Sequence, residues 1–129
     1  MKSKKVILDT NLWISFLISQ KLDYIDEFLI KEKIKLIFSS ELLEEFLTVA
    51  KRPKFRKYFS DRNIKELLRL FDKYGEFIEV HTNIDKCRDF KDNFLLNLAI
   101  DSKANFLITG DSDLLEIKKI NNTKILSWA

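Results

Sequence analysis

The sequence predicts an α/β fold, a three-layer α/β/α sandwich in which a central, mainly parallel sheet of about five strands lies between layers of helices. Short runs of β-branched and aromatic apolar residues, each about strand length, alternate along the chain with longer helical patterns. These runs are nearly continuous, as expected for strands covered on both faces. The chain has 129 residues, of which 46% are hydrophobic and 33% charged, so it can bury one core. Without a linker or repeat, residues 1–129 are predicted to form a single domain.

The individual elements follow from these patterns in chain order. Five strands are predicted at Val6–Leu8, Leu36–Phe38, Phe77–Val80, Phe106–Ile108 and Lys124–Leu126. Helices are predicted over 11–19 and 22–31 after the first strand, 40–50 after the second, 61–74 before the third, 93–103 before the fourth and 112–119 after it. Helices that separate apolar strands in this way are typical of a mainly parallel sheet with helices on both faces.

Composition narrows the compartment and the class of partner. The 23 basic and 20 acidic residues give a net charge of +3, which neither demands nor excludes a polyanionic partner. The single cysteine, Cys87, cannot form an internal disulfide and fits a reducing compartment. No stretch reaches the ~18 consecutive apolar residues of a membrane span, and the N-terminus runs into Asp9 too soon for a secretory signal. We therefore expect a soluble, cytoplasmic protein with no membrane partner.

Acidic residues gather where the predicted strands end. In an open parallel sheet the functional crevice lies beyond the carboxyl ends of the strands. Asp9 directly follows the first strand, and Asp111 and Asp113 follow the fourth. Two acids on helices join them: Glu45 in "SSELLEEFLTVAKRPK" and Asp92, at the start of the apolar helix over 93–103. We expect these carboxylates to share one edge of the sheet.

Each acid also has a simpler interpretation. Asp9, Asp92 and Asp111 could each be a helix N-cap, and the glutamates of the 40–50 helix could form a solvated face. Their shared location favours a site, because carboxylates gathered at one edge repel each other unless a positive group lies among them. A divalent metal ion is the usual solution. Ligands that are almost all oxygen suit Mg²⁺ or Mn²⁺, with one or two ions acting on phosphate groups.

The remaining side chains exclude other chemistries. His81 and Cys87 are the only imidazole and thiolate, so a closed tetrahedral zinc site cannot form. Acid–base hydrolysis without a metal would need two groups that titrate near neutrality. No serine lies in a Gly-x-Ser-x-Gly turn and no Gly-rich phosphate loop is present. We interpret His81 as a surface residue at a strand end and Cys87 as structural.

Four segments together resemble a PIN domain. They are "VILDTNLWISFL", "SSELLEEFLTVAKRPKF", "CRDFKDNFLLNLAIDSKANFLITGDSDLL" and "TKILSWA", and they lie in the order and spacing of the family over essentially the whole chain. The likeness is to the group assigned as toxin components of bacterial toxin–antitoxin pairs. Because many PIN domains are Mg²⁺- or Mn²⁺-dependent ribonucleases with a parallel α/β/α fold, the resemblance implies the same fold, cofactor and RNA substrate.

Carried over position by position, the resemblance implies an acidic quartet of Asp9, Glu45, Asp92 and Asp111. It implies that Asp9, Asp92 and Asp111 hold the metal, while Glu45 helps to hold it or orients the attacking water. Glu44 is adjacent to Glu45 and points roughly 100° away on the helix, and the register against the following Arg-Pro-Lys motif favours Glu45. The supporting positions of the family are matched by Thr10, Asn11, Ser39, Thr109 and Asp113.

A basic stretch, "KRPKFRK", follows the helix that carries Glu45. A phosphate backbone could lie across it, and Phe55 or Tyr58 could stack on a base. The alternative is a solvated loop with buried aromatic residues, and the sequence favours neither. The candidate RNA-binding residues are Lys51, Arg52, Lys54, Arg56 and Lys57.

These observations lead us to expect a divalent-metal-dependent endoribonuclease that hydrolyses RNA phosphodiesters, as the toxin of a toxin–antitoxin pair. Its expected partners are RNA and a cognate antitoxin protein in the acidic crevice, and a homodimer is compatible with the sequence. The alternative is a catalytically silent module of PIN fold that binds RNA or protein. A phosphate-accepting receiver domain is disfavoured, because receivers carry an acid pair after the first strand, where Asp9 stands alone.

Overall fold

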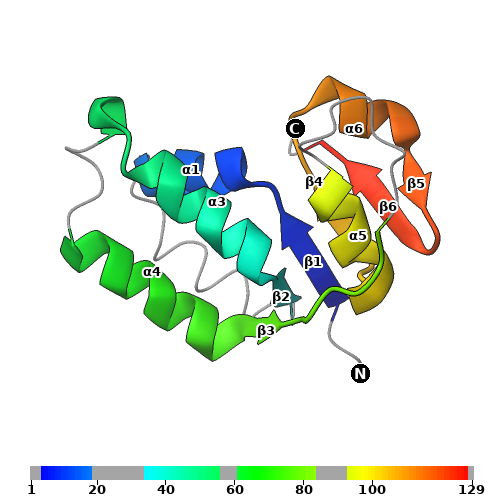
Figure 1. Cartoon of the computed structure of the whole chain (residues 1–129), viewed down its shortest axis with the longest axis horizontal. Helices are drawn as coiled ribbons and strands as arrows, with labels where there is room; N and C mark the ends of the chain where they lie inside the picture. The colour runs from blue at the N-terminus through cyan, green and yellow to red at the C-terminus, as the bar shows by residue number, and fades with distance from the viewer. Residues whose placement is uncertain (1–3, 19–33, 56–60, 84–92, 128–129) are drawn as a thin grey trace.

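The computed structural model describes residues 4–18, 34–55, 61–83 and 93–127, which form a sheet flanked by helices (Figure 1). The strands are β1 (Lys4–Leu8), β2 (Ile34–Phe38), β3 (Gly75–Phe77), β4 (Phe106–Ile108), β5 (Lys119–Ile120) and β6 (Thr123–Leu126). The helices are α1 (Thr10–Ile18), α3 (Ser40–Ala50), α4 (Asp61–Tyr74), α5 (Asn93–Ser102) and α6 (Ser112–Ile117), with a 3-10 helix η1 at Pro53–Phe55. None of the described helices is both long and apolar enough to cross a membrane.

The sheet has the strand order β3-β2-β1-β4-β6-β5. All neighbouring strands pair in parallel except β5 and β6, which are antiparallel. The chain proceeds from β1 through β2 to β3 in one direction and then returns to β4 on the other side of β1. The strand order therefore reverses between β1 and β4, which is where open α/β sheets place their functional crevice. The predicted α/β fold with a mainly parallel sheet is confirmed.

The element boundaries differ most from the prediction at the third strand and at the last helix. The third strand lies at Gly75–Phe77 rather than Phe77–Val80, because α4 runs directly into it and Phe77 pairs with Phe38 of β2. The helix predicted over 112–119 ends at Ile117, because Lys118 has a positive φ of 66° and leaves the helical conformation. The chain then forms the unpredicted strand β5 and turns back through Asn121, whose φ is 50°. The predicted helix over 22–31 lies outside the described residues.

One core face of the sheet lies under α5 and α6. Ile7, Leu107 and Ile125 are neighbours across β1, β4 and β6, and each is 5% exposed or less. Thr123 points to the same face of β6, and its hydroxyl donates to the carbonyl of Ala104, just after α5, at 2.7 Å. The C-terminal strands are therefore fixed to α5 by packing and by a buried hydrogen bond.

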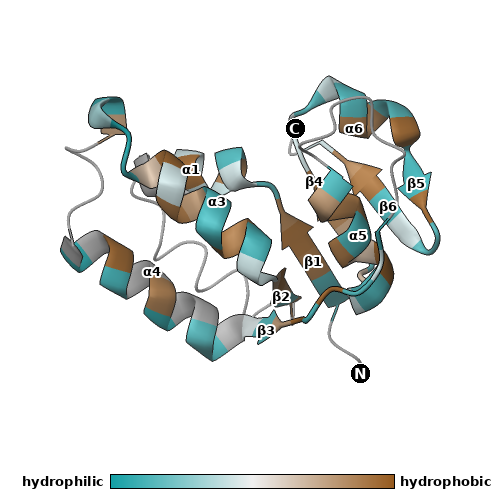
Figure 2. Cartoon of the chain, in the orientation of Figure 1, coloured by the Kyte–Doolittle hydropathy of each residue, from teal (hydrophilic) through white to brown (hydrophobic). Residues whose placement is uncertain are grey.

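On the opposite face α1 packs against β2, and α3 packs beside α1. Val6, Leu36 and Phe38 are buried there, and the ring of Trp13 on α1 lies 5.7 Å from the ring of Phe38. This cover does not extend to β6, where buried and exposed residues alternate, with Lys124 and Leu126 exposed. In Figure 2, β1 is hydrophobic along most of its length, whereas β6 changes from hydrophilic to hydrophobic. The strands on the β6 side thus have one covered and one open face.

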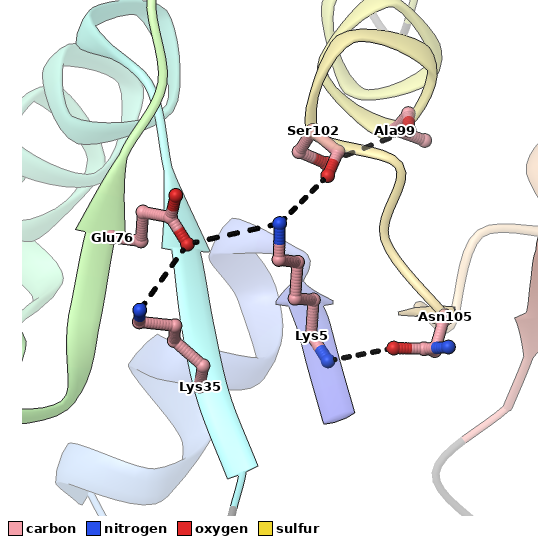
Figure 3. A network of polar contacts seen from close by, with 6 residues as sticks. All are labelled: Lys5, Lys35, Glu76, Ala99, Ser102 and Asn105. Carbon is pink, nitrogen blue, oxygen red and sulfur yellow. Dashed lines mark hydrogen bonds and ion pairs between the residues drawn. The ribbon is translucent and has the colours of Figure 1, made fainter. Parts of the chain in front are cut away.

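A polar network fixes the edge strand β3 on the α5 side (Figure 3). Glu76 Oε2 lies 3.5 Å from Lys35 Nζ and 4.0 Å from Lys5 Nζ. Lys5 Nζ also donates to the carbonyl of Ser102 at 3.4 Å, while its backbone N–H donates to Asn105 Oδ1 at 2.8 Å. These side chains are a third to a half exposed, so each ion pair contributes only ~0.2–1 kcal/mol. The network joins three strands to α5.

Candidate active site

The candidate site lies where β1 and β4 end side by side. Asp9 follows β1, and its backbone N–H donates to the carbonyl of Ile108 at 3.0 Å, which extends the β1–β4 pairing by one residue. Thr109 and Asp111 follow β4 at the same edge. The structure therefore places Asp9 and Asp111 at the same edge of the sheet, at the strand-order reversal.

The hydroxyl of Thr109 links the two aspartates. Thr109 is fully buried, and its Oγ1 donates to Asp9 Oδ2 at 2.6 Å and accepts the N–H of Asp111 at 3.0 Å. Because the Asp111 N–H occupies an acceptor position, the single hydroxyl proton is directed at the Asp9 carboxylate. Asp9 is 7% exposed, so this hydrogen bond is made away from bulk water. The sequence identified Thr109 only as a supporting residue, without this link.

The N-cap interpretation holds for one aspartate and not for the other. Asp111 is the N-cap of α6, and its Oδ1 accepts the N–H of Asp113 at 2.8 Å. Asp9 precedes α1, and its carbonyl accepts the N–H of Leu12 at 3.0 Å, but its carboxylate turns to Thr109. Asp9 therefore occupies the position before the helix, but its carboxylate accepts a hydrogen bond from Thr109 of the neighbouring strand end instead of capping α1.

The supporting residues differ in their surroundings. Thr10 is buried, and its Oγ1 has no hydrogen-bond partner among the described residues. Ser39 is also buried, but its hydroxyl is the N-cap of α3 and accepts the N–H of Leu42 at 3.2 Å. Asn11 is exposed on α1. Of the three, Thr10 is the one whose buried oxygen still lacks a described partner.

The two adjacent glutamates of α3 differ in exposure. Glu45 is half-buried, whereas Glu44 is exposed. Within residues 4–18, 34–55, 61–83 and 93–127, no three His, Cys, Asp or Glu side chains are grouped so that they could hold a metal ion. The structure therefore does not bring Glu45 into a metal-holding group with Asp9 and Asp111. Asp92, the third predicted metal ligand, lies outside the described residues.

The described donors at this edge suit a hard divalent cation. Asp9 and Asp111 contribute carboxylate oxygens, and the orphaned hydroxyl of Thr10 comes directly after Asp9. A buried polar atom without a partner is commonly explained by a water molecule or an ion. Oxygen donors favour Mg²⁺ or Mn²⁺, which retain several waters and need few protein ligands. The residues present fit such an ion.

A comparison with protein families assigns this fold. The model of the PIN domain matches residues 5–113, most of the chain. The chain belongs to the PIN domain family. PIN domains are generally nucleases, so membership supports a hydrolase activity.

Similar proteins agree with this assignment. Uncharacterized protein MJ1680 of Methanocaldococcus jannaschii is 39% identical over 131 residues, covering 92% of this PIN domain chain and 81% of that protein. A chain in the structure of VapBC2 from Rickettsia felis, bound to a DNA fragment from its promoter, has a TM-score of 0.61 at 20% identity. The alignment covers 97% of this chain and 99% of the VapBC2 chain. The PIN domain endonuclease Utp24 has a TM-score of 0.60 at 23% identity, with coverage of 97% and 85%. At such identities the structural likeness establishes the fold.

The basic stretch of this PIN domain is exposed in its described part. Lys51, Arg52 and Lys54 are exposed, while Arg56, Lys57 and Tyr58 lie outside the described residues. Phe55 packs against the core, and Lys54 Nζ lies 4.9 Å over the centroid of its ring. Phe55 is therefore half-buried, with a cation over its ring. The lysine and arginine side chains remain candidates for phosphate contacts.

Asp101, which the sequence analysis did not single out, binds the segment that follows β3 through hydrogen bonds. Asp101 of α5 accepts hydrogen bonds from the hydroxyl and backbone N–H of Thr82 and from the N–H of His81. These bonds, the Thr82 hydroxyl first, hold the pKa of the Asp101 carboxyl below its ordinary value of 3.8. His81 itself is exposed, as predicted. Asp101 therefore fixes the backbone at His81 and Thr82 against α5.

Proposed function

We propose that this PIN domain is a divalent-metal-dependent endoribonuclease that hydrolyses RNA phosphodiesters. The observation that carries the proposal is the buried hydroxyl of Thr109, which joins the carboxylate of Asp9 to the backbone N–H of Asp111 at the reversal point of a PIN fold. Neither carboxylate has an ion-pair partner in the described part of the chain. Two acids at one edge of the sheet without a paired cation favour the binding of a positive ion from solution.

In this proposal Asp9 and Asp111 hold one or two Mg²⁺ or Mn²⁺ ions, with Asp92 as the third ligand that the resemblance implies. A bound divalent ion supplies a more acidic water and offsets the charge of the attacked phosphate. Thr109 keeps the Asp9 carboxylate in one orientation, because its donated hydrogen bond fixes Oδ2. Asp111 is fixed in the same way by its capping bond to Asp113. The half-buried Glu45 is proposed to orient water at the metal, and Asn11 to contact phosphate.

We further propose that the protein acts as the toxin of a toxin–antitoxin pair in the cytoplasm. The fold shared with VapBC2, a protein solved on its promoter DNA, supports this role. An antitoxin would then cover the acidic edge and could place a basic side chain against Asp9 and Asp111. A PIN module that binds RNA or protein without cleaving it is the alternative, and the same experiment tests it.

The experiment is cleavage of an end-labelled RNA of mixed sequence in Mg²⁺, in Mn²⁺ and in EDTA. We expect cleavage with either metal and none in EDTA. Asp9→Asn and Asp111→Asn keep the size of each side chain, and asparagine also keeps the α6 cap. Each change should lower the rate by more than about 100-fold, because even residues that only support a metal ligand contribute ~10–100-fold.

Asp72→Asn is the matched control, because Asp72 is an exposed acid of α4 and the change removes the same charge. Its rate should equal that of the unchanged protein. Circular dichroism and thermal unfolding establish that each variant is folded. Cleavage that survives EDTA, or that survives in folded Asp9→Asn, would refute the metal mechanism. RNA binding without cleavage under every metal condition would support the silent module instead.

A further inference from the structure

The half of the sheet beyond β1 has an uncovered side. In β4, Leu107 is buried while Phe106 and Ile108 are half-buried, and in β6 the exposed Lys124 and Leu126 alternate with buried residues. Register places Phe106 beside Lys124, and Ile108 beside Leu126, on the same side of the sheet. This side faces away from α5 and α6, since Ile125 points toward those helices. We call it the open sheet face; its residues are Lys4, Phe106, Ile108, Lys119, Lys124 and Leu126.

A row of lysines crosses the open sheet face. Lys124 pairs with Phe106 on one side and with Lys119 of β5 on the other, so these three side chains lie in line across three strands. Lys4 Nζ lies 5.9 Å over the centroid of the Phe106 ring and adds a further cation to the same row. The row therefore presents three positive charges, of which Lys4 and Lys124 lie next to the Phe106 ring.

These lysines differ from those on the α5 side of the sheet. There, Lys5 and Lys35 share the carboxylate of Glu76 (Figure 3). On the open sheet face, neither Lys119 nor Lys124 has an ion-pair partner among the described residues. Burying these charges against an apolar protein surface would be costly, because an unpaired charge loses its hydration. A polyanion supplies the partners that they lack.

The open sheet face is continuous with the candidate active site. Ile108 and Leu126 form its upper row, and the next residues in their strands are Thr109 and Ser127, with Thr109 N–H donating to the carbonyl of Leu126 at 2.9 Å. Phe106 is three residues before Thr109, which corresponds to roughly 10 Å along a strand. A nucleic-acid strand whose phosphate lies at Asp9 and Asp111 can thus reach the lysine row within a short segment.

We infer that the open sheet face binds a single-stranded segment of RNA next to the cleavage site, with phosphates on Lys119 and Lys124 and a base on Phe106. This inference rests on the proposed function, since it assigns the substrate strand of the same site. Unpaired bases can stack on an aromatic side chain, and lysines around it hold the backbone. The acidic edge repels a polyanion, so the attraction must come from such nearby cations.

The test uses the full chain in EDTA, so that binding is measured without cleavage. A short fluorescent single-stranded RNA is titrated by anisotropy over a range of salt concentrations. The double variant Lys119→Gln, Lys124→Gln should bind roughly tenfold more weakly, and its logarithmic salt slope should be smaller by about 1.4, or ~0.7 for each lost phosphate contact. The control is Lys65→Gln, Arg69→Gln, which removes two exposed charges from α4 at the opposite edge of the sheet. It should change affinity less than twofold.

A second variant tests the stacking separately. Phe106→Leu keeps an apolar side chain and should weaken RNA binding about fivefold, since leucine has no aromatic face on which a base can stack. It should leave the binding of inorganic polyphosphate unchanged, because that probe has no bases. A general loss of structure would lower both affinities, so equal losses would overturn the assignment of Phe106.

The outcomes separate this inference from the proposed function. If the lysine variant retains the wild-type salt slope, or the α4 control loses as much affinity, the open sheet face does not hold RNA, whether or not the protein cleaves it. If the lysine variant loses RNA affinity but no preparation cleaves RNA with metal, the surface stands and the nuclease proposal fails. If light scattering shows that the variant dissociates a dimer while RNA affinity is unchanged, the face is a protein contact and the inference is overturned.

Discussion

Replacing Thr109 with valine removes the hydroxyl that links Asp9 to Asp111 and keeps the shape of the side chain. The variant loses one hydrogen bond to a carboxylate, worth ~1.5–3 kcal/mol, and one from a backbone N–H, worth ~1 kcal/mol. Both partners stay in place without a donor or acceptor. We therefore expect the free energy of unfolding to fall by about 3 kcal/mol. At ~2.1 cal/mol/K for each of 129 residues, this corresponds to a Tm lower by about 11 °C.

Thr109→Ser is the matched control, because it keeps the hydroxyl and loses one methyl group. It should cost only about 1 kcal/mol, or about 4 °C. Urea and thermal unfolding followed by circular dichroism measure both variants, with EDTA present because a bound cation would add its own stabilisation. A valine variant within 1 kcal/mol of the wild type, or a serine variant as unstable as the valine one, would show that the hydroxyl link does not hold this edge together.

Three further changes test other parts of the molecule. Asp101→Asn should lower the free energy of unfolding at neutral pH, because hydrogen bonds led by that of the Thr82 hydroxyl stabilise the Asp101 carboxylate and lower its pKa in the folded protein. That stabilisation is lost when the carboxyl protonates, so the difference from the wild type should vanish as the pH falls below 3.8. Urea unfolding from neutral to acid pH measures the difference. Glu45→Gln should slow RNA cleavage at least about tenfold while Glu44→Gln leaves it unchanged, and equal rates would remove the glutamate from the site. Arg52→Gln should reduce the salt slope of RNA binding by about 0.7, and an unchanged slope would return the basic stretch to a solvated loop.

The central strands were predictable because their apolar residues are continuous and both faces are covered. β1, β2 and β4 lie close to the predicted positions for this reason. β5 was missed because two residues, Lys119 and Ile120, cannot display a periodic pattern. The adjacent asparagines at 121 and 122 were its available signal, since asparagine favours the left-handed turns of tight hairpins.

The candidate site was predictable in its position and not in its internal contacts. Asp9 and Asp111 follow strands that topology makes neighbours, so their shared edge follows from sequence order and parallel pairing. The role of the Thr109 hydroxyl depends on side-chain rotamers and on the Asp111 N–H beside it, which no spacing rule encodes. The open sheet face was missed for a similar reason. The alternation of "TKIL" in β6 indicates one covered face, but which lysines align with Phe106 depends on strand register.

A metal-dependent ribonuclease needs both negative charge to hold a cation and positive charge to hold RNA, and the candidate site and the open sheet face carry these opposite charges. Asp9 and Asp111 are held by neutral donors, a hydroxyl and a backbone N–H, so their negative charge is oriented without being neutralised by a described residue. Such an edge attracts a cation and repels RNA in its absence. The lysine row about 10 Å away attracts the phosphate backbone with or without that cation. RNA binding should therefore depend on Lys119 and Lys124 under all conditions, whereas cleavage depends on what occupies the acidic edge. In the proposed toxin–antitoxin pair, an antitoxin that placed a basic side chain there would compete with the proposed metal ion and leave the lysines to bind RNA.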